Sequence, residues 1–255
     1  MRKAILGLMP AVILATVCWA GSDPWKDKPY SQWDDKDIQH IMTSSPWMRT
    51  VSVTAGWAQP DYNLPGDNPR PAQQQPSGGG GMGGQGKGGG GSSSPSSGNT
   101  DSPSSTPEVE FQVYWMSSRT IRGALGRRAI LHGGKDAAEV DRAVAAPTDE
   151  FEILVQGRDM APFINNDEKF FQANSHLEIK KSKEKLSPSH VTMVHGANGK
   201  TVTSASFFFP KKSAAGEDQI APDEKDVQFT VSLGKSTLKV DFEPRKMDDQ
   251  KGPDL

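Results

Sequence analysis

Four arginines lie close together in one predicted helix, and their spacing is the strongest indication of a binding surface. Arg119, Arg122, Arg127 and Arg128 lie around or opposite the apolar stripe of a helix that we expect over 119–131. A basic helix face of this kind would bind a phosphate, an anionic lipid or an acidic polymer. The alternative is a solvated helix face, balanced by the acidic residues that follow it. Those residues are Asp136, Glu139 and Asp141.

Two tryptophans near the start of the chain form a second candidate surface. Trp25 and Trp33 lie in the segment that enters the first predicted helix. Exposed rings there would stack on sugars or hold a peptide. The alternative is that both rings pack inward and fix this segment to a sheet. Trp57 and Trp115 alternate with valines, so we expect those two in the core.

The remaining ionisable residues predict no catalytic, cofactor-binding or metal site, and we expect no cofactor. The histidines are at positions 40, 132, 176, 190 and 195, and no two of them have the helical or strand spacing of a metal-binding pair. The sequence also has no Gly-x-Ser-x-Gly turn. Facing carboxylates and Ser–His–acid groupings depend on the tertiary structure, so a hydrolase stays an alternative.

A phosphate-loop pattern occurs at 81–87, within a run of glycines. Such a loop needs a strand before it and a helix after it to hold its N–H groups on the phosphates. Neither is predicted here, and Gly88 stands where Ser or Thr would bind magnesium. We therefore predict no nucleotide site in this segment.

The first twenty residues predict export. Arg2 and Lys3 precede an apolar stretch over 4–19, and small residues follow it, which is the pattern of a cleaved signal peptide. We expect cleavage after Ala20 and a periplasmic or extracellular protein without a transmembrane span. Cys18 is the sole cysteine, so cleavage there would leave no thiol or disulfide chemistry. The alternative is a lipoprotein anchored through Cys18.

Composition separates one segment from the rest. Residues 58–107 are nearly all Gly, Ser, Pro, Gln, Asn and Asp, and we expect this insert to be disordered. The signal holds two of the 29 basic residues and none of the 31 acidic ones, which leaves the mature chain with a net charge of −4. That balance argues against a nucleic-acid partner. We expect a monomer whose partner is an envelope polymer or a protein.

The ordered segments predict an α+β protein with a mostly antiparallel, curved sheet of seven or eight strands and about three helices in the first half. Asn198-Gly199 and Gly234-Lys235 predict two hairpin turns. The predicted organisation is a signal peptide over 1–20, a helix–strand segment over 21–57 that packs on the main domain, the insert over 58–107, a main domain over 108–246 and a flexible tail over 247–255.

Several short sequence motifs, taken in order, resemble those of other proteins. Trp33 precedes a short helix that Ser45-Pro46-Trp47 follows, residues 113–118 (VYWMSS) lead into the arginine-bearing helix, and residues 207–211 are FFFPK. In the order of these motifs, the chain is similar to a group of uncharacterised exported proteins of soil bacteria. The motifs concern packing, so the resemblance implies a fold and a compartment but no activity.

The sequence as a whole favours an exported, non-catalytic protein that binds or scaffolds something at the cell envelope. The alternatives are an envelope hydrolase with a carboxylate or serine site, and a lipoprotein held by Cys18.

Overall fold

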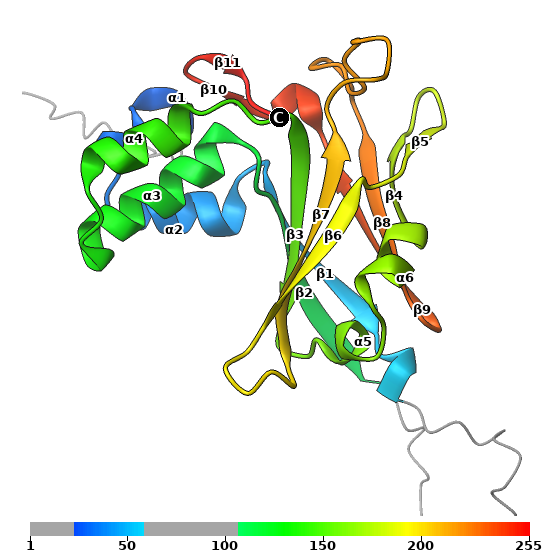
Figure 1. Cartoon of the computed structure of the whole chain (residues 1–255). Coiled ribbons are helices and arrows are strands. Elements are labelled where there is room, and N and C mark those ends of the chain that lie inside the picture. Colours follow the sequence, from blue (N-terminus) through cyan, green and yellow to red (C-terminus); the bar gives the residue numbers. More distant parts are fainter. Residues whose placement is uncertain (1–22, 59–106) are drawn as a thin grey trace, which may run out of the picture.

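Two antiparallel sheets face each other in the computed structural model, which describes residues 23–58 and 107–255 (Figure 1). The predicted signal peptide and Cys18 lie outside the described residues. So does the insert with its 81–87 motif, apart from its two end residues.

The larger sheet has five strands in the order β1-β2-β3-β7-β6, and every neighbouring pair is antiparallel. Its strands are β1 (Met48–Thr54), β2 (Glu108–Trp115), β3 (Glu150–Gly157), β6 (His190–His195) and β7 (Val202–Pro210). Apolar and polar residues alternate along β2 and β3, so each strand presents one apolar face inward and one polar face outward. The N-terminal segment belongs to this sheet, because β1 pairs along its whole length with β2.

The second sheet has four strands in the order β5-β4-β8-β9. Its strands are β4 (Ser175–Ile179), β5 (Glu184–Leu186), β8 (Val227–Leu233) and β9 (Ser236–Phe242). Gly199 and Gly234 have φ angles of 65° and 74°, so both predicted hairpin turns form at residues that tolerate the left-handed conformation.

The core lies between the two sheets and is built from aromatic rings. Trp115 of the larger sheet meets Phe242 of the smaller one at 5.2 Å between ring centroids, and Phe207 meets Phe229 at 5.1 Å. These four side chains are fully buried. Edge-to-face contacts of this kind add to the free energy gained from burial.

Short helices fill the space at one edge of the two sheets. The helices α5 (Ala161–Ile164) and α6 (Glu168–Ala173) connect β3 to β4, and they carry Phe163 and Phe171 into the core, where the rings stack at 4.7 Å. Glu168 also accepts a hydrogen bond from the backbone N–H of Met193 on the edge strand β6 (3.2 Å). This contact occupies a polar group that an edge strand would otherwise leave unpaired.

The other four helices of the described chain gather at one end of the sheets (Figure 1). They are α1 (Pro24–Asp27), α2 (Asp35–Ser44), α3 (Arg119–Gly133) and α4 (Ala137–Ala145), with a 3-10 turn η1 (Tyr30–Gln32) between the first two. Asp34 and Asp37 form a capping box at the start of α2, and the hydroxyl of Ser118 caps α3.

The predicted α+β class and its mostly antiparallel strands are confirmed. The strands divide between two sheets, where the sequence predicted one curved sheet, because the short helices α5 and α6 carry the chain across from one sheet to the other. Strand β1 ends at Thr54, and Trp57, which the sequence predicts in the core, lies in a 3-10 turn η2 (Gly56–Ala58) and is only partly buried, with its ring 6.2 Å from that of Phe111.

The last nine residues are ordered, although the sequence predicted a flexible tail there. After the 3-10 turn η3 (Pro244–Lys246), they form a two-strand hairpin, β10 (Asp248–Asp249) and β11 (Gly252–Pro253), beside the helices. Met247 is fully buried and Asp254 is 1% exposed. Polar contacts to α3, which no local pattern reveals, hold this segment in place.

Candidate functional site

The four arginines of the predicted basic patch do different things in the structure. Arg119 binds Asp249 through Nε and one terminal nitrogen (3.0 and 2.9 Å). Arg122 donates to the carbonyl groups of Ala143 and Ala146 at the end of α4 (2.9 and 2.8 Å). These two side chains therefore tie α3 to its neighbours.

Of the other two arginines, one is also engaged within the protein and the other is not. Arg127 donates to the carbonyl oxygen of Trp33 (3.0 Å). Arg128 is exposed and has no hydrogen bond or ion pair within the described part of the chain. The structure thus leaves one of the four arginines available for a ligand.

The two candidate tryptophans are buried, each with 3% of its surface exposed. The indole N–H of Trp33 donates to the carbonyl oxygens of Pro24 and Lys28, both at 3.1 Å. Trp25 stacks on His40 with 5.6 Å between ring centroids. Neither ring is an exposed platform, and both hold the N-terminal segment against α2 and α3.

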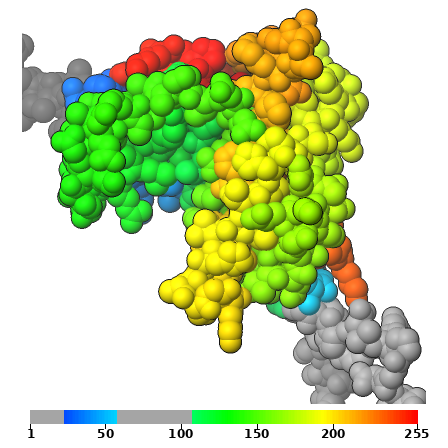
Figure 2. Space-filling model, viewed as in Figure 1, coloured from blue at the N-terminus to red at the C-terminus, as the bar shows by residue number. Residues whose placement is uncertain are grey.

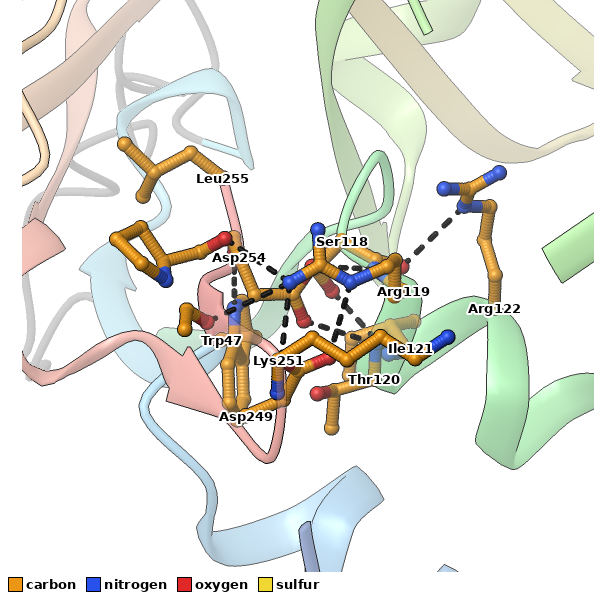
Figure 3. Close-up of polar contacts among 12 residues, drawn as sticks. Trp47, Ser118, Arg119, Thr120, Ile121, Arg122, Asp249, Lys251, Asp254 and Leu255 are labelled. Atoms are coloured by element: carbon orange, nitrogen blue, oxygen red, sulfur yellow. Dashed lines mark hydrogen bonds and ion pairs between the residues drawn. The ribbon is translucent and has the colours of Figure 1, made fainter. Parts of the chain in front are cut away.

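A buried carboxylate closes the start of α3 (Figure 3). The Asp254 side chain accepts hydrogen bonds from the backbone N–H groups of Arg119 (2.6 Å) and Thr120 (2.9 Å). Its backbone oxygen accepts a hydrogen bond from the indole of Trp47 at 2.6 Å. Burial raises the pKa of the Asp254 carboxyl, and the two N–H groups oppose that shift. The N-terminus of α3, which would attract an anion, is therefore occupied from within.

A groove of about 740 Å³ lies where α2 and α3 overhang the outer face of the larger sheet. Figure 2 shows the hollow between the helical end of the molecule and the strands below it. The helices contribute Asp35, Ile38, Gln39, Met42, Thr43, Leu125, Arg128 and His132, and the sheet side contributes Gln112, Tyr114, Met116, Leu154 and Gln156. Arg128 thus lies at a concave surface, whereas the other three arginines do not line it.

The groove floor is a small network of amides and a phenol. Gln112 and Gln156 lie opposite each other on β2 and β3, and Gln156 donates to the side-chain oxygen of Gln112 at 2.9 Å. The hydroxyl of Tyr114 donates to the same oxygen at 3.2 Å, and burial raises the pKa of Tyr114. Within the described residues, the amide nitrogen of Gln112 and the amide oxygen of Gln156 keep no hydrogen-bond partner. The floor therefore offers one free donor beside one free acceptor.

The groove has a charged rim and continues along the sheet. At its helical end, His132 Nε2 lies 2.6 Å from Asp35 Oδ1. Past Gln112 and Gln156, a second hollow of about 320 Å³ extends it toward Glu110 and Arg158. An elongated ligand would therefore cross both strands before it reached the far charges.

One Ser–His–Glu grouping bears on the hydrolase alternative. The hydroxyl of Ser189 donates to Glu150 and lies 2.9 Å from Nδ1 of His190. In a catalytic triad the acid orients the histidine, and the histidine activates the serine. Here the carboxylate holds the serine directly, and His190 Nδ1 is 3.9 Å from Glu150. This order does not prepare Ser189 as a nucleophile.

The described ranges contain no group of three or more His, Asp or Glu side chains placed to hold a metal ion. No helix within them is long and apolar enough to cross a membrane.

Sequence reasoning missed the groove floor and Asp254. The alternation marks Gln112 only as an outward strand position, and Gln156 lies just beyond the strand expected over 151–155; their meeting depends on a register between residues 44 positions apart. Asp254 lies 135 positions from Arg119. No local signal identifies either contact.

Comparison of the chain with protein-family models, with curated proteins and with solved structures finds no match.

Proposed function

We propose that the mature chain is an exported, non-catalytic binding module, and that the groove beneath α2 and α3 takes an extended segment of a partner protein. The observation that carries this is the free donor and the free acceptor on adjacent strands of the groove floor. A peptide group needs both, since it carries one N–H and one C=O.

The walls support a peptide over a sugar. Met42, Met116 and Leu125 give the groove an apolar side, and methionine adapts its shape to varied side chains. Tyr114 is only 4% exposed, so it offers no aromatic platform for a sugar ring. A polypeptide combines a polar main chain with apolar side chains, and the groove places polar amides on its floor beside an apolar wall.

The binding test uses extended peptides selected from a random library on the whole mature protein. We expect Gln156→Ala and Arg128→Glu each to weaken the selected peptides about tenfold, which corresponds to about 1.4 kcal/mol. Lys181→Glu is the control for the charge change, because Lys181 is exposed and does not line the groove. Fluorescence anisotropy measures the affinities, and thermal unfolding checks that each variant is folded. Equal affinity for wild type and both groove variants would refute the assignment.

Export rests on the sequence of the first 22 residues. Mass spectrometry of the mature protein should find a chain that begins at Gly21. A diacylated Cys18 would instead establish the lipid-anchored form.

A further inference from the structure

A separate hollow of about 400 Å³, away from the groove and its extension, lies between α1, the segment after α2 and the turn η3. Its lining includes four basic side chains but only two acidic ones. The basic residues are Lys26, Arg49, Arg245 and Lys246, and the acidic ones are Asp23 and Glu243. This basic cleft carries an excess of positive charge on a chain whose overall charge is negative.

Two buried polar atoms belong to residues of the basic cleft and have no partner in the described chain. They are Nε1 of Trp25 and Oγ of Ser45, whose residues are 3% and 2% exposed. A buried donor without an acceptor loses its hydrogen bonds to water without replacement, so native proteins rarely leave one. Both atoms can donate a hydrogen bond, and an indole N–H can only donate. Within the described chain six buried side-chain polar atoms lack a partner, and these two belong to residues that line the cleft, where an accepting ligand would pair with them.

The cations of the cleft are only partly neutralised. Glu243 is shared between Lys246 at 2.8 Å and Arg245 at 3.5 Å. Lys26 lies 3.8 Å from Asp23. The side chains of Lys26, Arg245 and Lys246 are about half exposed, which leaves them free to turn toward a ligand.

Arg49 adds a fixed positive charge. Its Nη1 donates to the carbonyl oxygens of Ser45, Pro46 and Met48, and its Nε donates to that of Asp241. Neutral carbonyl groups hold the guanidinium in place, and the carboxylates of Glu243 and Asp241 offset part of its charge. The cleft thus has a preorganised positive potential beside the mobile cations.

We propose that the basic cleft binds a phosphate group. A phosphate presents several acceptor oxygens in a tetrahedral arrangement, so it can serve the indole, the hydroxyl and the surrounding cations together. A carboxylate has only two oxygens. This site is separate from the groove beneath α2 and α3, and it does not depend on the function proposed for that groove.

The test follows the indole N–H resonances of the ¹⁵N-labelled mature protein, with Trp25→Phe identifying the Trp25 signal. Inorganic phosphate is titrated against sodium chloride of the same ionic strength. We expect the Trp25 signal to shift and saturate at millimolar phosphate. The double variant R245Q/K246Q should weaken this response about tenfold. The double variant K181Q/K183Q removes two lysines elsewhere and should leave it unchanged.

A parallel titration with glycerol phosphate distinguishes the source of the group. Saturation by both probes assigns a phosphate monoester, as on a polymer or a lipid headgroup, and saturation by inorganic phosphate alone assigns the free ion. The proposal is overturned if neither probe shifts the Trp25 signal beyond the chloride control. It is also overturned if R245Q/K246Q responds as the wild type does.

Discussion

Removal of the Asp254 carboxylate should destabilise the fold, although the residue lies in a segment that the sequence marks as a tail. The carboxylate is 1% exposed and accepts the first two backbone N–H groups of α3. Asp254→Ala deletes both acceptors and also leaves Arg119 with one fewer charged neighbour, 3.7 Å from its Nε. Asp254→Asn keeps the shape and one acceptor oxygen, so it separates the loss of charge from the loss of the contact.

The magnitude follows from the groups left unpaired. Each buried N–H without an acceptor costs about 1–3 kcal/mol. Part of this cost is offset, because the alanine variant no longer has to bury a carboxylate away from water. We expect Asp254→Ala to lower the free energy of unfolding by about 3 kcal/mol. For a protein of this size that is a fall in Tm of roughly 6–12 °C. Asp254→Asn keeps an acceptor for one N–H and places a donor amide against the other, so it should cost about 1–3 kcal/mol, less than the alanine variant.

Burial of Asp254 also predicts a dependence on pH. The raised pKa means that the folded state holds a proton that the unfolded state has already released. The stability that protonation contributes is therefore lost as the pH rises from the ordinary value of 3.8 through the raised one. Because Asn does not titrate, the advantage of the wild type over Asp254→Asn should shrink over that window.

Urea unfolding followed by tryptophan fluorescence measures these differences, with Asp223→Ala as the control. Asp223 is an exposed aspartate in the same third of the chain and makes no contact with α3. If Asp254→Ala unfolds at the same urea concentration as Asp223→Ala, the C-terminal segment does not hold α3 as the structure indicates.

Two further changes test the packing of the helical end. Burial and a hydrogen bond to Asp141 raise the pKa of Tyr30 to about 12, so the stability that this contact contributes should be present below pH 10 and lost as the pH rises from 10 to 12. In an absorbance titration, Tyr30→Phe should lack the tyrosine that ionises near pH 12 in the wild type, and an unchanged titration would contradict the contact. Gly126→Ala would place a Cβ 2.4 Å from Cγ1 of Val140, so it should lower the free energy of unfolding, measured in urea, by about 1–3 kcal/mol. In the control Gly133→Ala the new Cβ meets only its own helix, so that variant should be neutral or stabilising. Equal effects of the two substitutions would contradict the close approach of α3 and α4.

Local patterns accounted for much of the secondary structure. The alternation along β2, the Asn198-Gly199 turn and the Ser118 cap each depend on residues a few positions apart, and each was predictable because the physics that produces it is equally local. The short helices α5 and α6 were missed because four and six residues are too few for a helical period to show.

The candidate sites were only partly predictable. The sequence marked Arg128 and Trp25 among six candidate residues, and it gave no reason to separate Arg128 from Arg119. The separation appears only when Arg119 meets Asp249, which lies 130 positions away. The residue type determines which interactions a side chain can make, and the tertiary structure determines whether a partner within the protein already uses them.

The sequence by itself determined the fold class, the outward and inward faces of the main strands and the starts of the longer helices α2, α3 and α4, since periodicity and capping act over a few residues. Only the tertiary structure decided that the strands form two sheets, that Gln112 meets Gln156, and that Asp254 closes α3. These contacts join residues far apart in the chain, and the packing of the whole molecule selects each partner from many of the same chemical type.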